Sequence, residues 1–197
     1  MPYLVFDTET TGLPDWRQPA DAPGQPRLAS FALLCVDDDL EIEDRAYGVV
    51  LPDGWQMPAE ATAVNGLTNE QLQTEGFPIS YVMNLFHHAA IGRTLVAHNL
   101  QFDTKIARGE FRRLGGEFES RAQRWLSGIC TMRGLVEACA IPHPTRSGYK
   151  YPRLGEACTK LLGGELVGAH HALTDAKACL RLLRYMIAHN FCRAGAA

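Results

Sequence analysis

Two carboxylates near the start of the chain are the first residues whose type and spacing could do chemistry. Asp7 and Glu9 follow a mostly apolar run at residues 2–6 and precede a Thr-Thr-Gly turn signal at residues 10–12. This pattern predicts a buried strand, in which residues two apart share a face at a spacing of roughly 6–7 Å. Such a pair either holds a divalent cation such as Mg²⁺, which prefers oxygen ligands, or is solvated where the strand meets a loop.

Two further acids each lie beside the expected end of an element. Asp103 follows a predicted strand at residues 94–97 and falls in the first turn of a predicted helix at 99–115, which Asn99 can cap. Asp175 lies at the start of the last predicted helix. An acid in a first turn can also simply complement the helix dipole, so each position alone stays ambiguous.

Three motifs carry these acids in order: DTETTGL at residues 7–13, AHNLQFD at 97–103 and HHALTD at 170–175. Together they resemble the DEDDh exonucleases, whose site has four acids and a histidine, in the ribonuclease-H-like superfamily. The resemblance covers residues 1 to about 190, and YPRLGEACTKLLGG at 151–164 is similar to the branch of DNA polymerase III epsilon-like proofreading exonucleases. It implies an α/β, ribonuclease-H-like fold with a central five-stranded mixed sheet flanked by helices.

The family pattern H-x-A-x-x-D distinguishes two adjacent histidines. His170 lies five residues before Asp175 and is followed at the family interval by Ala172, so it aligns with the catalytic histidine. His171 is the alternative; four residues before Asp175, it would stack over that acid if the helix had already begun.

The resemblance implies two Mg²⁺ or Mn²⁺ ions and hydrolysis of nucleic acid from its 3′ end, which releases nucleoside 5′-monophosphates. We expect Asp7 to bridge the ions, Glu9 and Asp175 to complete the site of the attacking water, and Asp103 to help hold the second ion through water. His170 is expected to be the general base, so the predicted catalytic residues are these four ligands and His170.

In the resembling family, the turn that follows the paired acids contacts the last nucleotide, and Thr10, Gly12 and Leu13 hold those positions here. Phe102 either stacks on a base or sugar or belongs to the core. Asn65 departs from the family, since many relatives have a histidine there, and the long loop at 13–27 could narrow or extend the entrance. The predicted substrate-binding residues are Thr10, Gly12, Leu13, Asn65, Asn99 and Phe102.

The remaining elements follow from apolar periodicity and turn signals. Strands at 28–36 and 41–51, joined by an acidic turn at 37–39, should form an antiparallel meander with the first strand. A further strand is expected at 125–129. Helices are expected at 59–64, from Thr68 to about 72, at 80–92 after a Ser80 cap, at 131–140 after a Thr131 cap, at 154–162, and after Asp175 with a buried stripe of Leu173, Ala176, Leu180, Leu183 and Ile187.

Length and composition favour one domain. The 197 residues, 46% of them hydrophobic, fit an exonuclease domain at residues 1–190 and a short C-terminal tail at 191–197. The six cysteines lack metal-binding spacing, and we expect them to be reduced. No apolar run of 18 residues and no basic leader occur, so we expect no membrane span, no signal peptide and a cytoplasmic location.

Charge is unevenly distributed, with a formal charge of −11 in residues 1–104 and +6 in residues 105–160. The basic part suits a phosphate backbone and the acidic part suits cations, unless both are merely solvated faces. We favour single-stranded DNA as the partner, with short RNA as the alternative and a non-catalytic nucleic-acid-binding protein as the rival class. The acidic segment that begins at Asp7 does not fit a twelve-residue calcium-binding loop, because the twelfth position, which should be a glutamate, is Gln18. Association with a polymerase is compatible with the resemblance, but we expect no tail to support it, because the sequence ends soon after the last predicted helix.

Overall fold

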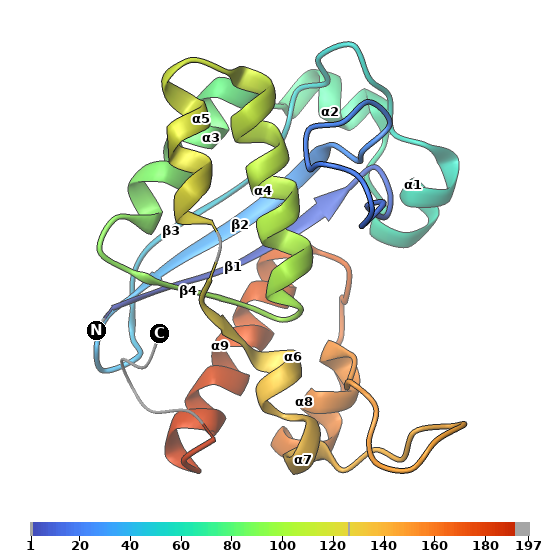
Figure 1. Cartoon of the computed structure of the whole chain (residues 1–197), viewed down its shortest axis with the longest axis vertical. Coiled ribbons are helices and arrows are strands. Elements are labelled where there is room, and N and C mark those ends of the chain that lie inside the picture. Colours follow the sequence, from blue (N-terminus) through green and yellow to red (C-terminus); the bar gives the residue numbers. More distant parts are fainter. Residues whose placement is uncertain (1, 126, 192–197) are drawn as a thin grey trace.

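The computed structural model describes residues 2–125 and 127–191, and these residues form one five-stranded mixed sheet with the strand order β3-β2-β1-β4-β5 (Figure 1). The strands are β1 Tyr3–Thr10, β2 Leu28–Val36, β3 Ile42–Val49, β4 Thr94–Ala97 and β5 Ile129–Cys130. The first three pair antiparallel, whereas β4 pairs parallel with β1 and with β5. The predicted mixed sheet and its antiparallel meander are therefore confirmed.

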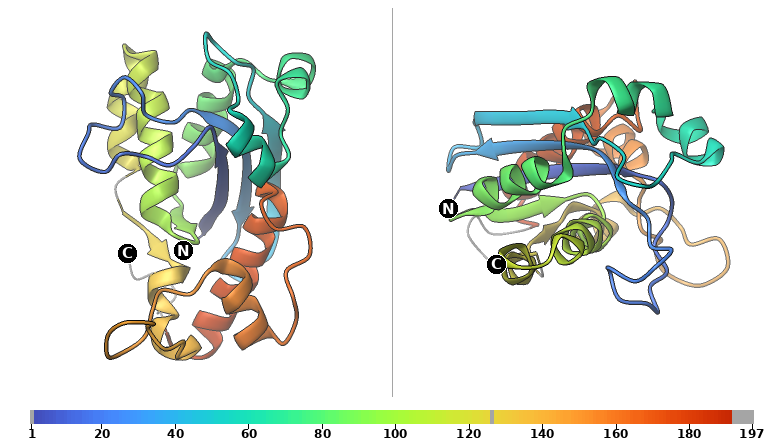
Figure 2. Two further views of the ribbon diagram at one scale, coloured as in Figure 1. Left: turned by 90° about the vertical axis from the view of Figure 1, so that its right-hand side faces the viewer. Right: turned by 90° about the horizontal axis from the view of Figure 1, so that it is seen from above.

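Helices cover both faces of this sheet (Figure 2). α3 and α4 pack on one face, and α8 and α9 pack on the other. Their bounds, with the short 3₁₀ helix η1, are α1 Ala59–Asn65, α2 Asn69–Glu75, α3 Ile79–Ala90, α4 Leu100–Leu114, α5 Glu117–Arg121, η1 Ala122–Arg124, α6 Thr131–Gly134, α7 Val136–Cys139, α8 Leu154–Leu162 and α9 Ala172–Ala188.

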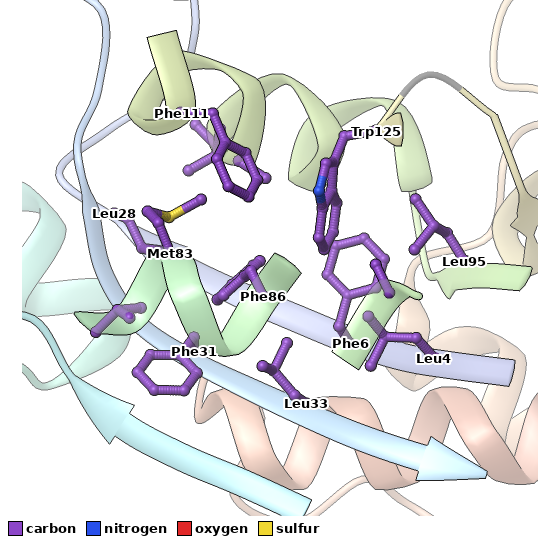
Figure 3. Packing of buried hydrophobic residues seen from close by; sticks show 14 of the residues in the cluster. Leu4, Phe6, Leu28, Phe31, Leu33, Met83, Phe86, Leu95, Phe111 and Trp125 are labelled. Carbon is purple, nitrogen blue, oxygen red and sulfur yellow. The ribbon is translucent and has the colours of Figure 1, made fainter. Parts of the chain in front are cut away.

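The core on the α3–α4 face is rich in aromatic side chains (Figure 3). Phe6 of β1 meets the Trp125 ring edge to face, with centroids 5.1 Å apart, and Phe86 of α3 lies 5.2 Å from the same ring. Trp125 is fully buried there. Each such aromatic contact stabilises the fold by about 1 kcal/mol beyond the contribution of the apolar area that it buries.

The opposite face contains the alternate residues of the same strands. Tyr3 and Val5 of β1 pack here with Ala176 and Leu180 of α9. Since residues along a strand point alternately to the two faces, Asp7 and Glu9 continue toward the α9 side and Thr8 toward the α4 side. Of the predicted α9 stripe, Ala176, Leu180 and Leu183 are buried, and Leu173 and Ile187 are partly buried.

Two predicted elements near Trp125 differ in the structure. The strand expected at 125–129 is reduced to β5, because Trp125 ends a 3₁₀ turn and its ring packs into the core; residue 126 lies outside the described residues. The helix expected at 131–140 is split at Leu135, whose ψ of 9° interrupts the helical backbone.

Two predicted helix caps are wrong, one is right in position alone, and one is confirmed in full. α3 begins at Ile79 after Pro78 rather than after Ser80, and Thr131 is the first residue of α6 rather than its cap. Asn99 occupies the N-cap position of α4, as predicted, but its backbone is left-handed, with φ of 72°, and its side chain makes no cap bond. The Thr68 side chain accepts the Gln71 N–H at 3.1 Å, as predicted for an N-cap.

The described cysteines are all free, and four of these five are buried. Cys192 and, apart from Phe191, the predicted tail at 191–197 lie outside the described residues. Among the helices of residues 2–125 and 127–191, none combines the length and apolar character needed to cross a membrane.

Candidate active site

Three element ends meet at one edge of the sheet: the end of β1, the start of α4 and the start of α9. In the left view of Figure 2, the blue 13–27 loop, the teal α1 and the red start of α9 lie around this edge. A cavity of about 620 Å³ opens there. All eleven predicted site residues line it: Asp7, Glu9, Thr10, Gly12, Leu13, Asn65, Asn99, Phe102, Asp103, His170 and Asp175.

The side chains from β1 and α9 approach one another most closely. One ligand atom each of Glu9, His170 and Asp175 lie within 4.8 Å of one another, and these three could hold a metal ion. Asp7 lines the same cavity. Burial raises its pKa well above the usual value, and repulsion from the neighbouring acids Asp103, Asp175 and Glu9 raises it further. The structure therefore brings together four acids that are separated by up to 168 residues in the chain.

Asp103 is held in place by Thr8, which lies between the two acids of β1. The Thr8 hydroxyl donates to Asp103 Oδ1 at 2.8 Å, and the Thr8 backbone N–H donates to the same oxygen at 3.0 Å. Thr8 points toward α4 because the strand alternates. We did not predict this role, since the only sequence signal is the position of Thr8 between the paired acids.

The structure separates the roles of the two adjacent histidines. His170 is exposed with a left-handed backbone, φ of 65°, and its N–H donates to Asp175 Oδ2 at 3.0 Å. His171 instead contacts β3, where its Nε2 lies 2.9 Å from the Tyr47 hydroxyl and the two rings lie 4.9 Å apart. His170 thus lines the cavity, and His171 fastens the same loop to the sheet.

Burial makes the negative charge at this site unfavourable. Burial, with repulsion from Asp175, raises the pKa of Glu9 to about 7. Burial also raises the pKa of Asp103 to about 7, although the hydrogen bonds from Thr8 lower it. The pKa of Asp175 is likewise raised by burial, although the hydrogen bond from the His170 N–H lowers it. Groups that resist ionisation in this way are common at functional sites.

The donor set fits hard divalent cations. Asp175 Oδ1 is buried and accepts no hydrogen bond from the described part of the chain. A buried carboxylate oxygen without a partner is costly, and a cation would satisfy it while relieving the repulsion among the four acids. Carboxylate oxygens are the ligands that Mg²⁺ and Mn²⁺ prefer. These four acids could therefore hold such ions.

The predicted substrate-binding residues join the walls of the cavity. The Asn65 side-chain nitrogen at the end of α1 donates to Thr10 O at 3.4 Å, and its Oδ1 accepts the Leu67 N–H at 3.0 Å. The Thr10 hydroxyl donates to Gly12 O at 2.7 Å. α1 supplies further lining residues that the sequence did not suggest, namely Glu60, Ala61 and Val64, with Pro58 preceding them.

His98 is a second histidine in the lining, and its surroundings indicate a structural role. Its Nε2 lies 3.0 Å from Pro152 O and its Nδ1 lies 2.9 Å from Thr131 Oγ1. A carbonyl only accepts, so Nε2 carries the proton and Nδ1 accepts from the hydroxyl. Burial lowers the pKa of His98 to about 4, so this ring stays neutral and links the chain near α8 to α6.

Comparisons with known proteins agree with this fold. The DNA polymerase III subunit epsilon-like protein of Rhodobacter capsulatus is 28% identical over 195 residues, which cover 98% of this chain and 25% of that protein. The DNA polymerase III subunit epsilon of Treponema pallidum is 25% identical, over 95% of this chain and 77% of that protein. E. coli exonuclease I, solved with a dT13 oligonucleotide, superimposes with a TM-score of 0.75 at 19% identity over 94% of this chain.

The chain spans only a quarter of the Rhodobacter relative and 41% of the exonuclease I chain. The likeness to exonuclease I shows the shared fold, and the predicted ribonuclease-H-like architecture is confirmed by it. The family model RNase_T, described as exonuclease, matches residues 4–183, which include all three sequence motifs. The chain therefore belongs to this exonuclease family, as its resemblance predicted.

Proposed function

We propose that this chain is a divalent-metal-dependent 3′–5′ exonuclease of the DEDDh type, with a single catalytic domain at residues 1–190 that acts in the cytoplasm. It hydrolyses the terminal phosphodiester bond of single-stranded DNA and releases nucleoside 5′-monophosphates. The observation that carries this proposal is the meeting of Glu9, His170 and Asp175 within 4.8 Å, in the same cavity as Asp7 and Asp103. A cavity of about 620 Å³ has the volume of a small-ligand site, which suits a terminal nucleotide.

Two Mg²⁺ or Mn²⁺ ions would be held by the four acids Asp7, Glu9, Asp103 and Asp175. When bound, the ions would neutralise phosphate charge and make a bound water easier to deprotonate. His170 lines the cavity with a ring nitrogen within 4.8 Å of the Glu9 and Asp175 carboxylates, and imidazole is the side chain that exchanges protons near neutral pH. His170 therefore takes the proton of the attacking water. Thr8 holds the Asp103 carboxylate in place in the same cavity through its hydroxyl.

The comparisons support DNA as the substrate class. Exonuclease I, which shares the fold, was solved with a dT13 oligonucleotide, and both curated relatives carry the name of a DNA polymerase subunit. From the names of these relatives we further propose that the chain takes part in proofreading or repair of DNA and associates with a polymerase. Short RNA is the alternative substrate, because both nucleic acids present the same terminal phosphodiester to the acids.

A labelled-oligonucleotide assay tests this function. The protein with Mg²⁺ or Mn²⁺ should release mononucleotides from the 3′-labelled end of a single-stranded DNA, shorten a 5′-labelled strand stepwise, and stop in EDTA. Asp7→Asn should lose this activity by at least 10³-fold, since one carboxylate of the site becomes neutral. Parallel matched RNA and duplex DNA substrates rank the alternatives. Binding without release would instead establish the non-catalytic nucleic-acid-binding protein.

A further inference from the structure

The loop at residues 13–27 is more firmly built than an exposed connection needs to be. Gln25 is 7% exposed, and its side-chain nitrogen donates to Asp15 O at 2.8 Å and to Pro19 O at 2.9 Å. The same nitrogen lies 3.3 Å from Gln18 O, and Gln25 Oε1 accepts the Asp15 N–H at 3.0 Å. One buried amide thus ties both halves of the loop together.

The loop is also fixed to α4, the helix that carries Asp103. Lys105 Nζ donates to Asp15 O and to Gln18 O, each at 2.8 Å. Further along α4, a Cβ on Gly109 would lie 2.5 Å from Ala20 O, so only glycine permits this close approach of helix and loop. The loop therefore has a fixed position relative to the acidic cavity.

This rigid loop presents two large apolar side chains to solvent. Leu13 is 88% exposed and lines the cavity, and Trp16 is 57% exposed three residues further on. Lys105 Nζ lies 5.2 Å from the centroid of the Trp16 ring. An ammonium has three protons, of which two are donated to the loop carbonyls, so one remains for a ligand.

We propose that Leu13, Trp16 and Lys105 form a stacking platform for the nucleotides that precede the 3′-terminal nucleotide of a single strand. Base stacking on an aromatic ring is tolerant of sequence, and a neighbouring cation suits the phosphate between stacked bases. Leu13 lines the cavity and Trp16 follows three residues later in the same anchored loop, which makes the strand that enters the cavity the occupant of the platform. This inference rests on the proposed function and extends its binding surface from Leu13 on the cavity wall to Trp16 and Lys105, which do not line the cavity.

Binding and hydrolysis of substrates of different length test the platform. In an Asp7→Asn background with Mg²⁺, Trp16→Ala should raise the Kd for fluorescein-labelled dT8 by about tenfold and leave the Kd for dTMP unchanged. Trp16→Phe should retain most of the affinity, because a smaller ring still stacks. In the otherwise native protein, Trp16→Ala should not change kcat or KM for the p-nitrophenyl ester of dTMP, which reaches only the cavity.

The matched control is Tyr81→Ala, which removes another surface aromatic, 49% exposed on α3. It should leave the Kd for dT8 unchanged. An equal loss for dT8 and dTMP, no loss for dT8, or no binding of dT8 by the parent protein would each overturn the platform. If dT8 binds as expected but the native protein releases no mononucleotide, the proposed catalytic function fails and the platform remains.

Discussion

Alternation along β1 explains how three consecutive residues serve the site differently. Asp7 and Glu9 point to the α9 side, where Asp175 presents a buried oxygen without a partner in the described chain. Thr8 points to the other side and donates twice to Asp103. A strand can supply a pair of ligands and a support for a third only when the two kinds of residue alternate. Shifting this segment by one residue would exchange their faces.

Replacing His170 separates proton transfer from metal binding. We expect His170→Ala to lower kcat about 10²–10⁴-fold with little change in the affinity for Mn²⁺, because the carboxylates hold the ions and the imidazole takes a proton. Steady-state kinetics and calorimetric titration with Mn²⁺ measure the two quantities. A large loss of Mn²⁺ affinity would make His170 a ligand instead, as its distance from Glu9 and Asp175 also allows.

The neighbouring pair supplies matched controls for this prediction. His171→Ala and Tyr47→Phe each remove the 2.9 Å contact between the 163–171 segment and β3, and neither side chain lines the cavity. We expect both variants to lower kcat by less than tenfold and to the same extent. A larger loss in His171→Ala than in His170→Ala would show that the base was assigned to the wrong histidine.

At the scale of elements, the parts of the site that follow local rules could be predicted from the sequence. Apolar runs located β1, β2 and β4, and the motifs located Asp103 and Asp175 in the first turns of α4 and α9. Tertiary packing overrode local pattern elsewhere: the apolar run from Trp125 suggested a strand, yet its ring fills the core under α4. Contacts between distant segments leave no local signal, so neither Thr8 nor Gln25 could be assigned its role.

Glu110 of α4 tests how firmly the helix holds the segment before β2. Its side chain is 1% exposed, forms ion pairs with Arg27 at 2.8 Å and Arg113 at 3.0 Å, and accepts the Leu28 N–H at 3.1 Å. Glu110→Ala leaves two largely buried guanidinium groups and an N–H without this partner, and we expect it to lower the free energy of unfolding by about 2–4 kcal/mol. Chemical denaturation measures this loss.

Glu117→Ala is the control for that experiment. Glu117 also pairs with an arginine, Arg121, at 3.3 Å, but its side chain is 74% exposed. Such a surface pair contributes at most about 0.5 kcal/mol, so this variant should unfold like the native protein. Equal effects of the two substitutions would contradict the view that Glu110 anchors the start of β2 to α4.

Considered as a whole molecule, the fold concentrates destabilising charge at a single edge. Two cores stabilise the faces of the sheet, and the β1, α4 and α9 ends bring the four acids together between them. Native packing therefore offsets the repulsion among Asp7, Glu9, Asp103 and Asp175. The same arrangement makes stability depend on protons and on divalent ions, because either can relieve the repulsion.

The pH dependence of unfolding follows from these raised pKa values. Glu9, with a pKa of about 7 in the folded chain against 4.5 ordinarily, keeps a proton that the unfolded chain has lost, and Asp103 does the same. The free energy of unfolding in EDTA should therefore fall as the pH rises from about 4.5 through about 7, and it should level off above about pH 8. His98, with its pKa lowered to about 4, has the opposite effect below about pH 6.5, so the measurement belongs between pH 6.5 and 8.5.

Thermal unfolding in EDTA should thus give a Tm that is several degrees lower at pH 8.5 than at pH 6.5. Mn²⁺ should raise Tm more at pH 8.5 than at pH 6.5, because ligands must lose their protons before they bind a metal. Glu9→Gln removes one titrating group and should flatten the fall in EDTA while reducing the gain from Mn²⁺. A Tm that is independent of pH in EDTA, with an equal gain from Mn²⁺ at both pH values, would mean that these acids do not share a charged, metal-binding cavity.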